Sequence, residues 1–569
     1  MEYHEQYRRW LAFEGLDAES RTELEALDEA EIRERFYAPL AFGTAGLRGI
    51  MGAGIQRMNR YTVNQTTQGL ADVLQTIDGA AEKGVAISYD CRINSETFAR
   101  SAASILAANG IQVYLFEGMR PTPELSFAIR SLGCAAGINI TASHNPKEYN
   151  GYKVYWSDGA QIGDEIAGQV SEAIQKCDIF TGVQTMDYDA ALQAGRIRLL
   201  GQETDEGFLK AALSCRLNTN SAQNENLQIV YTPFHGTGYR LVPEIFKRIG
   251  LKHVHCVPEQ MQPDGNFSTV KSPNPEEIEG FRLAIELAKK TGSDLIIGTD
   301  PDADRVGLIV RRSDGEYVPL SGNQVGILLA DYIIRTRRAA GTLPEKGMIV
   351  STVVTSLMAQ RICEANDVRY AESFTGFRFI AGRRAQMEEQ GYQYLLGFEE
   401  SYGYMVGDHC RDKDAVTASM LIAEMAADYA KQGMTLYDAM EHLYTVYGAY
   451  AERTMNLQFP GVDGLESMRR LMSRLRTETP KTIGGTAVVA ARDYQSGIRK
   501  LADGQTETMA LSGSNVLYFE LADGCVLIIR PSGTEPKIKL YILTRADSRD
   551  HACQLVEQYA KAAEALAKE

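Results

Sequence analysis

Four short segments of this 569-residue chain combine residue types that handle phosphate, metal ions or sugar hydroxyls. The first reads Thr-Ala-Ser-His-Asn-Pro at 141–146 and follows an apolar, strand-like run. Because Pro146 ends regular structure, we expect Ser143 at a strand terminus, where α/β folds place ligand chemistry. His144 and Lys153 lie close in sequence and could exchange protons or balance the charge of a phosphate. An ordinary Ser/Asn/Pro turn explains this segment equally well when it is taken alone.

The second segment places three carboxylates at alternate positions, Asp300, Asp302 and Asp304, directly after another apolar run. Clustered like charges repel, so a bound cation is their natural compensation. A calcium-binding EF-hand is excluded, because Arg305 occupies the position of its glycine and Arg311 that of its bidentate glutamate. A solvated acidic turn is the weaker alternative. The segment therefore predicts a metal site made of hard oxygen ligands.

The third segment, Gly-Phe-Glu-Glu-Ser at 397–401, also follows a strand-like run. The carboxylate of Glu399 and the hydroxyl of Ser401 could accept from and donate to neighbouring sugar hydroxyls. By itself this signal is weak, and an exposed acidic loop is the better interpretation. The charged residues at 411–414 that follow are consistent with a solvated charge run.

The fourth segment, Arg-Pro-Ser-Gly-Thr-Glu-Pro-Lys, begins at Arg530. The guanidinium fork, the hydroxyls of Ser532 and Thr534, and the backbone freedom of Gly533 would suit a phosphate dianion. A β-turn between strands with a surface arginine is an equally good interpretation.

The elements that must position these segments fall into two patterns. Three stretches, 84–116, 227–254 and 348–372, each read as strand, loop, helix and strand, and each is about the size of a βαβ unit. Their recurrence at long intervals predicts repeated α/β domains rather than a solenoid. Residues 517–521 and 537–542 instead alternate apolar side chains with polar or small ones, Asp523-Gly524 offers a turn between strands, and a charged helix follows at 548–568. The C-terminal part is therefore predicted to be an α+β module.

Composition narrows the class of protein. The length suggests three to five domains, and a net charge of −15 argues against a broad basic face for nucleic acid. We expect no membrane partner, since the N-terminus lacks a signal-peptide core and no apolar run approaches bilayer-spanning length. The nine cysteines are scattered without a C-x-x-C pair, which argues against a disulfide framework or a cysteine zinc site and favours reduced thiols in the cytoplasm.

Taken together and in this order, the four segments resemble the phosphohexomutase family, which comprises the phosphoglucomutases and phosphomannomutases. The resemblance covers nearly the whole chain. It implies an α/β fold of three similar domains with mixed sheets, plus a C-terminal α+β domain, around a central cleft. The implied domains are 1–205 with the phosphoserine loop, 206–318 with the metal loop, 319–452 with the sugar loop and 453–569 with the phosphate loop.

The resemblance also implies a role for each site residue. Ser143 would carry the phosphoryl group and Asp300, Asp302 and Asp304 would bind Mg²⁺ beside a phosphate oxygen. The implied catalytic cations and proton carriers are His144, Lys153 and Arg48. The implied substrate contacts are Arg305, Thr375, Gly376, Glu399, Ser401, Lys413, Arg530, Ser532, Gly533 and Thr534.

The implied reaction converts α-D-glucose 1-phosphate to glucose 6-phosphate, with glucose 1,6-bisphosphate as intermediate and primer. The Glu-Glu-Ser loop is more like phosphoglucomutases than the Glu-Met-Ser loop of many bacterial phosphomannomutases. Lys537 and Lys539 stand where many relatives have arginine. Mannose or pentose phosphates turned over by the same mechanism remain alternatives. A serine-dependent sugar phosphatase is less favoured, because a distal phosphate site would then lack a purpose, and a non-catalytic sensor would not need an intact serine and aspartate triplet.

Overall fold

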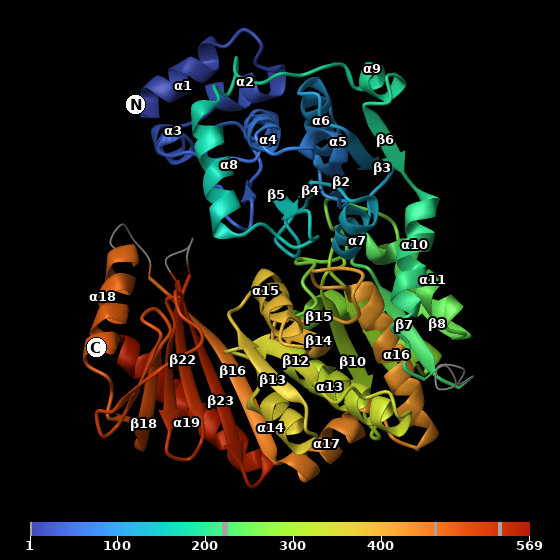
Figure 1. Cartoon of the computed structure of the whole chain (residues 1–569), viewed down its shortest axis with the longest axis vertical. Coiled ribbons are helices and arrows are strands. Elements are labelled where there is room, and N and C mark those ends of the chain that lie inside the picture. The colour runs from blue at the N-terminus through green and yellow to red at the C-terminus, as the bar shows by residue number, and fades with distance from the viewer. Residues whose placement is uncertain (1–2, 219–225, 460–463, 533–536, 569) are drawn as a thin grey trace. The chain divides into compact units, whose positions relative to one another are not determined.

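The computed structural model (Figure 1) describes residues 3–218, 226–459, 464–532 and 537–568. The chain forms two compact units. The first unit comprises Met1–Val325, Gly376–Gln386 and Leu395–Leu436. The second comprises Gly326–Thr375, Met387–Tyr394 and Tyr437–Glu569. The boundaries 1–205, 206–318, 319–452 and 453–569 stay a prediction.

The N-terminal part of the first unit is a six-stranded mixed sheet in the order β1-β5-β4-β2-β3-β6. Strands β2, β3, β4 and β6 run parallel, whereas β5 pairs antiparallel with both β4 and β1. The strands are β1 (Leu47–Ile50), β2 (Val85–Tyr89), β3 (Val113–Phe116), β4 (Ala136–Ile140), β5 (Tyr149–Trp156) and β6 (Ile197–Leu200). The helices are α1 (Tyr3–Ala12), α2 (Ala18–Glu25), α3 (Glu29–Phe36), α4 (Arg60–Gln75), α5 (Ala80–Lys83), α6 (Ser95–Ala108), α7 (Thr122–Leu132), α8 (Asp164–Lys176), α9 (Tyr188–Gln193) and α10 (Gln202–Leu213).

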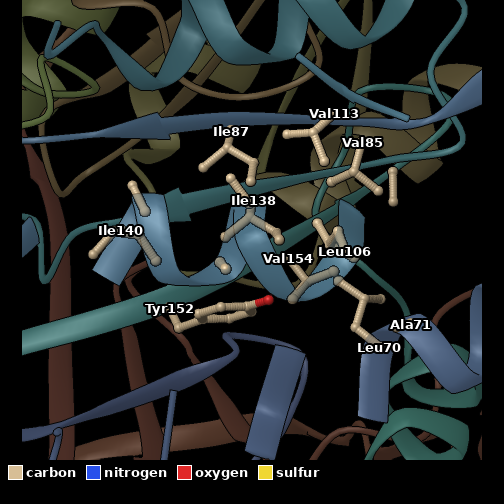
Figure 2. Packing of buried hydrophobic residues seen from close by; sticks show 14 of the residues in the cluster. Leu70, Ala71, Val85, Ile87, Leu106, Val113, Ile138, Ile140, Tyr152 and Val154 are labelled. Carbon is tan, nitrogen blue, oxygen red and sulfur yellow. The ribbon is translucent and has the colours of Figure 1, made fainter. Parts of the chain in front are cut away.

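The core of this sheet explains why its central strands are apolar on both faces. Every residue of β2 and of β4 is buried, as expected for parallel strands covered on both sides. Figure 2 shows Ile87, Ile138 and Val154 side by side, with Leu70 of α4 below them. This rigid layer fixes the carboxyl end of β4, from which the serine segment leaves.

A second mixed sheet in the first unit has the order β11-β10-β9-β7-β8. Strands β7, β8 and β9 are parallel, and β10 returns antiparallel to β9. The strands are β7 (Gln228–Thr232), β8 (His253–Cys256), β9 (Leu295–Thr299), β10 (Val306–Arg311) and β11 (Tyr317–Leu320). Its helices are α11 (Gly238–Arg248), α12 (Arg282–Thr291) and the short 3₁₀ turns η2 (Pro258–Gln260) and η3 (Ile278–Phe281). The aspartate segment is the tight connection between β9 and β10.

The third α/β portion of the chain is divided between the units. Strands β12 (Gly347–Thr352) and β13 (Arg369–Ser373) pair in parallel in the second unit. From Gly397 onward, within the first unit, β14 (Gln393–Glu399) pairs antiparallel with β15 (Gly403–Met405). The helices of this portion are α13 (Gly322–Ala339), α14 (Leu357–Ala365), α15 (Phe377–Glu388), α16 (Ala415–Lys431) and α17 (Leu436–Tyr447).

The C-terminal part of the second unit is an antiparallel sheet backed by helix α19. The strand order is β16-β23-β22-β21-β18-β19-β20, and β17 pairs with β18. Ala552, Tyr559 and Ala563 of α19 are buried in one core with the strands. The elements are β16 (Ala449–Gln458), α18 (Gly464–Thr477), β17 (Thr482–Ile483), β18 (Thr486–Asp493), β19 (Ile498–Leu501), β20 (Thr506–Thr508), β21 (Leu517–Leu521), β22 (Val526–Pro531), β23 (Lys537–Ala546) and α19 (Arg549–Lys568).

The predicted fold class is confirmed: α/β portions with mixed sheets precede a C-terminal α+β module. The three strand–loop–helix–strand stretches correspond to β2-α6-β3, β7-α11-β8 and β12-α14-β13. Within the described ranges, no helix is both long and apolar enough to cross a membrane.

Candidate functional site

Ser143 lies in a tight loop that follows β4. Its backbone adopts φ 53°, a left-handed conformation that costs a non-glycine residue about 1 kcal/mol or more. The backbone N–H of Ser143 donates to Thr141 Oγ1 at 2.8 Å. The residue is only 3% exposed, so the surrounding structure aims its hydroxyl in one direction.

A buried ion pair from the loop after β2 holds this conformation. Thr141 Oγ1 donates to Asp90 Oδ2 at 2.7 Å, and Asp90 is paired with the guanidinium of Arg92 at 3.2 Å. Arg92 in turn donates to the carbonyl oxygen of Ser143 at 2.6 Å and packs over the ring of Phe267. We did not predict Asp90 and Arg92 from the sequence, although their place directly after a buried strand is the signal that marks ligand loops in α/β folds.

The three aspartates form one compact, buried cluster. Ala303 has φ 48°, and Asp300 Oδ1 accepts hydrogen bonds from the backbone N–H groups of Asp304 and Arg305 at 3.0 and 2.9 Å. One carboxylate oxygen from each of Asp300, Asp302 and Asp304 lies within 4.8 Å of the others. All three are at most 1% exposed, so a solvated acidic turn is excluded.

This cluster has the electrostatics of a cation site. Burial raises the pKa of Asp300 well above its usual range, and the neighbouring charges of Asp302 and Asp304 raise it further. Asp302 Oδ1 and Asp304 Oδ1 are buried and accept no hydrogen bond from any described residue. Since a buried carboxylate oxygen without a partner is costly, these atoms are available as metal ligands.

Ser143 lies beside this cluster. Its Oγ is 2.8 Å from Asp300 Oδ2 and 3.2 Å from His144 Nδ1. Burial lowers the pKa of His144 well below its usual range, and the positive charges of Arg305 and Arg48 lower it further. The imidazole is therefore neutral near pH 7 and can accept a proton.

Two buried lysines neutralise the far side of the cluster. Lys153, on β5, is 2.7 Å from Asp302 Oδ2 and 3.5 Å from Asp304 Oδ2. Lys413 is 3.0 Å from Asp304 Oδ2 and 3.2 Å from Asp412 Oδ1. The interpretation of 411–414 as a solvated charge run is wrong, because Asp412 and Asp414 are 1% exposed and Lys413 is 9% exposed.

Thr122, at the start of α7, holds Asp302 in place through two hydrogen bonds. Its backbone N–H donates to the Asp302 carbonyl oxygen at 2.9 Å and its hydroxyl donates to Asp302 Oδ2 at 2.8 Å. Asn139 of β4 donates to Thr122 Oγ1 at 2.7 Å. The sequence patterns did not single out this residue.

The predicted arginines lie at the edges of the cluster. Arg48 is exposed on β1 and donates to Asn145 Oδ1 at 3.1 Å. Arg305 pairs with Glu276 at 2.7 Å and forms an antiparallel bridge with Gly403. That bridge joins the aspartate loop to the loop that contains Glu399 and Ser401.

The Glu399 loop is folded rather than exposed. Glu399 is 6% exposed, and its Oε1 accepts a 2.5 Å hydrogen bond from the backbone N–H of Gly376. Ser401 Oγ lies 3.5 Å from Glu399 Oε2. The interpretation of this segment as an exposed acidic loop is therefore wrong.

The other predicted substrate contacts belong to the second unit. Thr375 is the last residue of its first stretch. Arg530, at the end of β22, donates to Tyr541 Oη at 3.3 Å, and the backbone N–H of Ser532 donates to the Lys537 carbonyl at 2.8 Å. Gly533 and Thr534 lie outside the described residues.

Three consecutive stretches of the chain match profiles of one family. The profile described as "Phosphoglucomutase/phosphomannomutase, alpha/beta/alpha domain I" matches residues 39–179. Those of domain II and domain III match residues 206–315 and 321–447.

Curated relatives and solved structures agree with these matches. The protein named "Phosphoglucomutase" from Staphylococcus haemolyticus is 35% identical over 526 residues, covering 92% of this chain and 94% of its own length. Its namesake from Staphylococcus aureus strain N315 is 36% identical over 539 residues, covering 94% of each chain. The Paramecium phosphoglucomutase pp63/parafusin has a similar fold, with TM-score 0.68 and 18% identity, over 93% of this chain and 96% of that one. An N-acetylphosphoglucosamine mutase from Aspergillus fumigatus, solved with GlcNAc-6P and magnesium, has TM-score 0.52 and 14% identity over 93% and 96% of the two chains.

Proposed function

Because the chain belongs to the phosphoglucomutase/phosphomannomutase family, we propose that it is a phosphoglucomutase that transfers a phosphoryl group through Ser143. The substrates are α-D-glucose 1-phosphate and glucose 6-phosphate, and glucose 1,6-bisphosphate is the intermediate and primer. The observation that carries this proposal is the 2.8 Å contact between Ser143 Oγ and a buried carboxylate cluster. The names of the staphylococcal relatives support the choice of glucose.

Asp300, Asp302 and Asp304 would hold Mg²⁺. They fit this ion because they offer only oxygen ligands, and because Asp302 and Asp304 each have a buried oxygen without a partner among the described residues. When bound, the ion supplies neutralisation of the charge on the transferring phosphoryl group.

The residues around Ser143 supply the proton transfer and the positive charge that the reaction needs. Transfer breaks the bond between phosphorus and Ser143 Oγ and forms a bond between phosphorus and a sugar hydroxyl oxygen. The hydroxyl loses a proton, which the neutral imidazole of His144 can accept and return to Oγ, 3.2 Å away. Lys153 and Arg48 supply positive charge for the phosphate, Lys153 from a buried position.

The bisphosphate must then present its other phosphate to Ser143. Glu399 and Ser401, with Arg305, Gly376, Thr375 and Lys413, would contact the sugar in both orientations. Arg530, Ser532, Gly533 and Thr534 would bind the phosphate that is not being transferred. This second phosphate site favours a mutase over a phosphatase, whose hydrolytic reaction needs no such site.

Parallel assays test the proposal. Glucose 1-phosphate, mannose 1-phosphate and ribose 1-phosphate are supplied with Mg²⁺ and the matching bisphosphate, and both isomerisation and phosphate release are followed. We expect the highest kcat/KM for glucose 1-phosphate and no stoichiometric phosphate release. In Glu399→Gln we expect a loss of discrimination between the sugars with unchanged Mg²⁺ affinity. A higher kcat/KM for mannose or pentose phosphate would contradict the assignment of glucose phosphate as the substrate. Phosphate release without isomerisation would contradict the assignment of the protein as a mutase.

The remaining assignments are predictions of the same kind. Sugar phosphates are the proposed partners, and neither nucleic acid nor a membrane is needed for this chemistry. The cytoplasm is the proposed location, since all nine cysteines are unpaired.

A further inference from the structure

A second cluster of potential metal ligands lies in the first unit, in the segment between β15 and α16. One donor atom from each of His409, Cys410 and Asp414 lies within 4.8 Å of the others. Cys410 and Asp414 are at most 1% exposed, and the side chain of His409 is 5% exposed. The proposed phosphoryl transfer gives none of these side chains a role.

The imidazole of His409 is held between an acid and a thiol. Its Nε2 is 2.7 Å from Asp414 Oδ2, and its Nδ1 is 4.0 Å from the buried thiol of Cys215, which follows α10. The ring of Phe208 packs edge-on against it, with 5.6 Å between centroids. The ring orientation is therefore fixed before any ion arrives, which lowers the entropic cost of binding one.

The donor set differs in chemistry from the aspartate triplet. Imidazole, thiolate and carboxylate together are ligands of zinc-class cations, with bonds of about 2.0–2.3 Å, whereas three carboxylates suit Mg²⁺. Tetrahedral bonds of that length place neighbouring donors roughly 3–4 Å apart. Donor atoms that already lie within 4.8 Å need only small rotations to reach this spacing.

A purely structural ion pair explains part of this arrangement. Asp414 caps α16 by accepting from the backbone N–H of Thr417 at 2.9 Å. Burial lowers the pKa of His409, but Cys410 and Asp414 outweigh burial and hold that pKa well above its usual range. An imidazolium–carboxylate pair thus accounts for His409 and Asp414. The thiol of Cys410, which donates to the carbonyl oxygen of Asp412 at 3.5 Å, is not needed for that pair.

We propose that His409, Cys410 and Asp414 form a binding site for a zinc-class divalent cation, and that its occupancy acts on Lys413. Cys410 and Asp414 flank Lys413 in the chain, and Lys413 Nζ is 3.0 Å from Asp304 Oδ2. An ion that bridges the two flanking residues fixes the short segment from which Lys413 reaches the aspartate triplet. This second step rests on the proposed function, whereas the binding site does not.

The binding test uses the full-length protein in saturating Mg²⁺, stripped of transition metals, with Co²⁺ as the probe. Thiolate ligands give Co²⁺ a near-ultraviolet charge-transfer band that oxygen ligands do not give. We expect one equivalent of Co²⁺ to produce this band in the wild type and in Cys134→Ser, which removes a buried thiol of another core cluster. We expect Cys410→Ser to lose the band and His409→Ala to weaken Co²⁺ binding by about 10-fold or more. No band in the wild type, or an unchanged band in Cys410→Ser, overturns the proposal without any reference to enzyme activity.

The coupling to Lys413 has its own readout. With Mg²⁺ saturating, Zn²⁺ is titrated into the wild type and Cys410→Ser while glucose 1-phosphate turnover is measured. We expect Zn²⁺ to change kcat at least twofold in the wild type and to have a smaller effect in Cys410→Ser, because exchange of Mg²⁺ for Zn²⁺ at the aspartates is common to both. Identical Zn²⁺ responses alongside an intact Co²⁺ band refute the coupling. If neither the wild type nor Cys410→Ser has mutase activity, the Co²⁺ band still tests the binding site on its own.

Discussion

The hydroxyl of Thr122 donates a 2.8 Å hydrogen bond to Asp302 Oδ2, across 180 positions of sequence. Asp302 also accepts from Lys153, so one of its oxygens is fully engaged while Oδ1 has no partner among the described residues. Thr122 is thus a positioning residue, since it holds Oδ2 and leaves Oδ1 available to the proposed cation.

Thr122→Val tests this relationship. The change removes a buried hydrogen bond, which costs about 1 kcal/mol of stability, and it should weaken Mg²⁺ affinity several-fold because Asp302 is no longer oriented. Thr67→Val is the matched control, since it removes a buried hydrogen bond to Tyr152. Mg²⁺ titrations of activity that shift equally in both variants would assign Thr122 to stability alone.

Ser143→Ala should abolish turnover, by more than about 1,000-fold, since no other group replaces the nucleophile. Ser143→Gly should be as inactive but at least as stable, because glycine tolerates the left-handed backbone at this position. Intact-protein and peptide mass spectrometry should locate one removable phosphate on Ser143 of the wild type. Phosphate found only elsewhere, or an active glycine variant, contradicts the assignment.

Removal of divalent cations should inactivate the enzyme, and Mg²⁺ should restore it. Asp302→Asn should lower Mg²⁺ affinity on the order of 10-fold or more and reduce turnover with it, because a buried ligand charge is lost. Asp314→Asn, in an exposed turn, should leave both unchanged. Full activity in metal-free buffer would rule out a catalytic cation at the triplet.

Arg530→Ala should raise KM for both glucose phosphates by about 10-fold or more, the range for a lost charge-assisted hydrogen bond. Turnover should fall as well, since remote binding energy contributes to catalysis. Phosphorylation of Ser143 and Mg²⁺ affinity should not change. Arg453→Ala removes a surface ion pair of the same module and serves as the control. If the variant loses Mg²⁺ affinity while KM is unchanged, the loop does not bind the substrate phosphate.

Glu124 predicts a pH dependence of stability. Burial raises its pKa well above the usual range, and the adjacent Asp205 raises it further. The folded protein therefore keeps a proton that the unfolded chain releases near pH 4.5. The stability that the folded protein gains from this retained proton is fully present below pH 4.5. It is lost as pH rises through the pKa of Glu124 in the folded state. In Glu124→Gln, Tm should fall less steeply with rising pH than in the wild type. Glu117→Gln, at a half-exposed neighbour, should follow the wild type, and parallel curves for all three proteins would refute the raised pKa.

The sequence motifs were sufficient to identify the loops but not the contacts within them. Ser143 and the three aspartates are recognisable because strand ends followed by small, polar or acidic residues are local patterns. Thr122 and Asn139 act through tertiary contacts, which no local pattern reveals. The prediction that Glu399 and Lys413 are exposed was also wrong. A short charged segment is typical of solvated surface, and its sequence does not show which buried groups its charges pair with.

The discontinuity of the first unit has a consequence for synthesis on the ribosome. Its last stretch, Leu395–Leu436, contains Lys413 and is separated from the aspartate loop by residues that belong partly to the second unit. Translation adds about 5–20 residues per second, so Lys413 is added to the nascent chain several seconds or more after Asp304. During that interval one of the lysine partners of the cluster is missing, so the unit cannot reach its final charge balance until the chain has been extended past Leu436. Truncations that end before Lys413 are therefore expected to leave the aspartates incompletely neutralised.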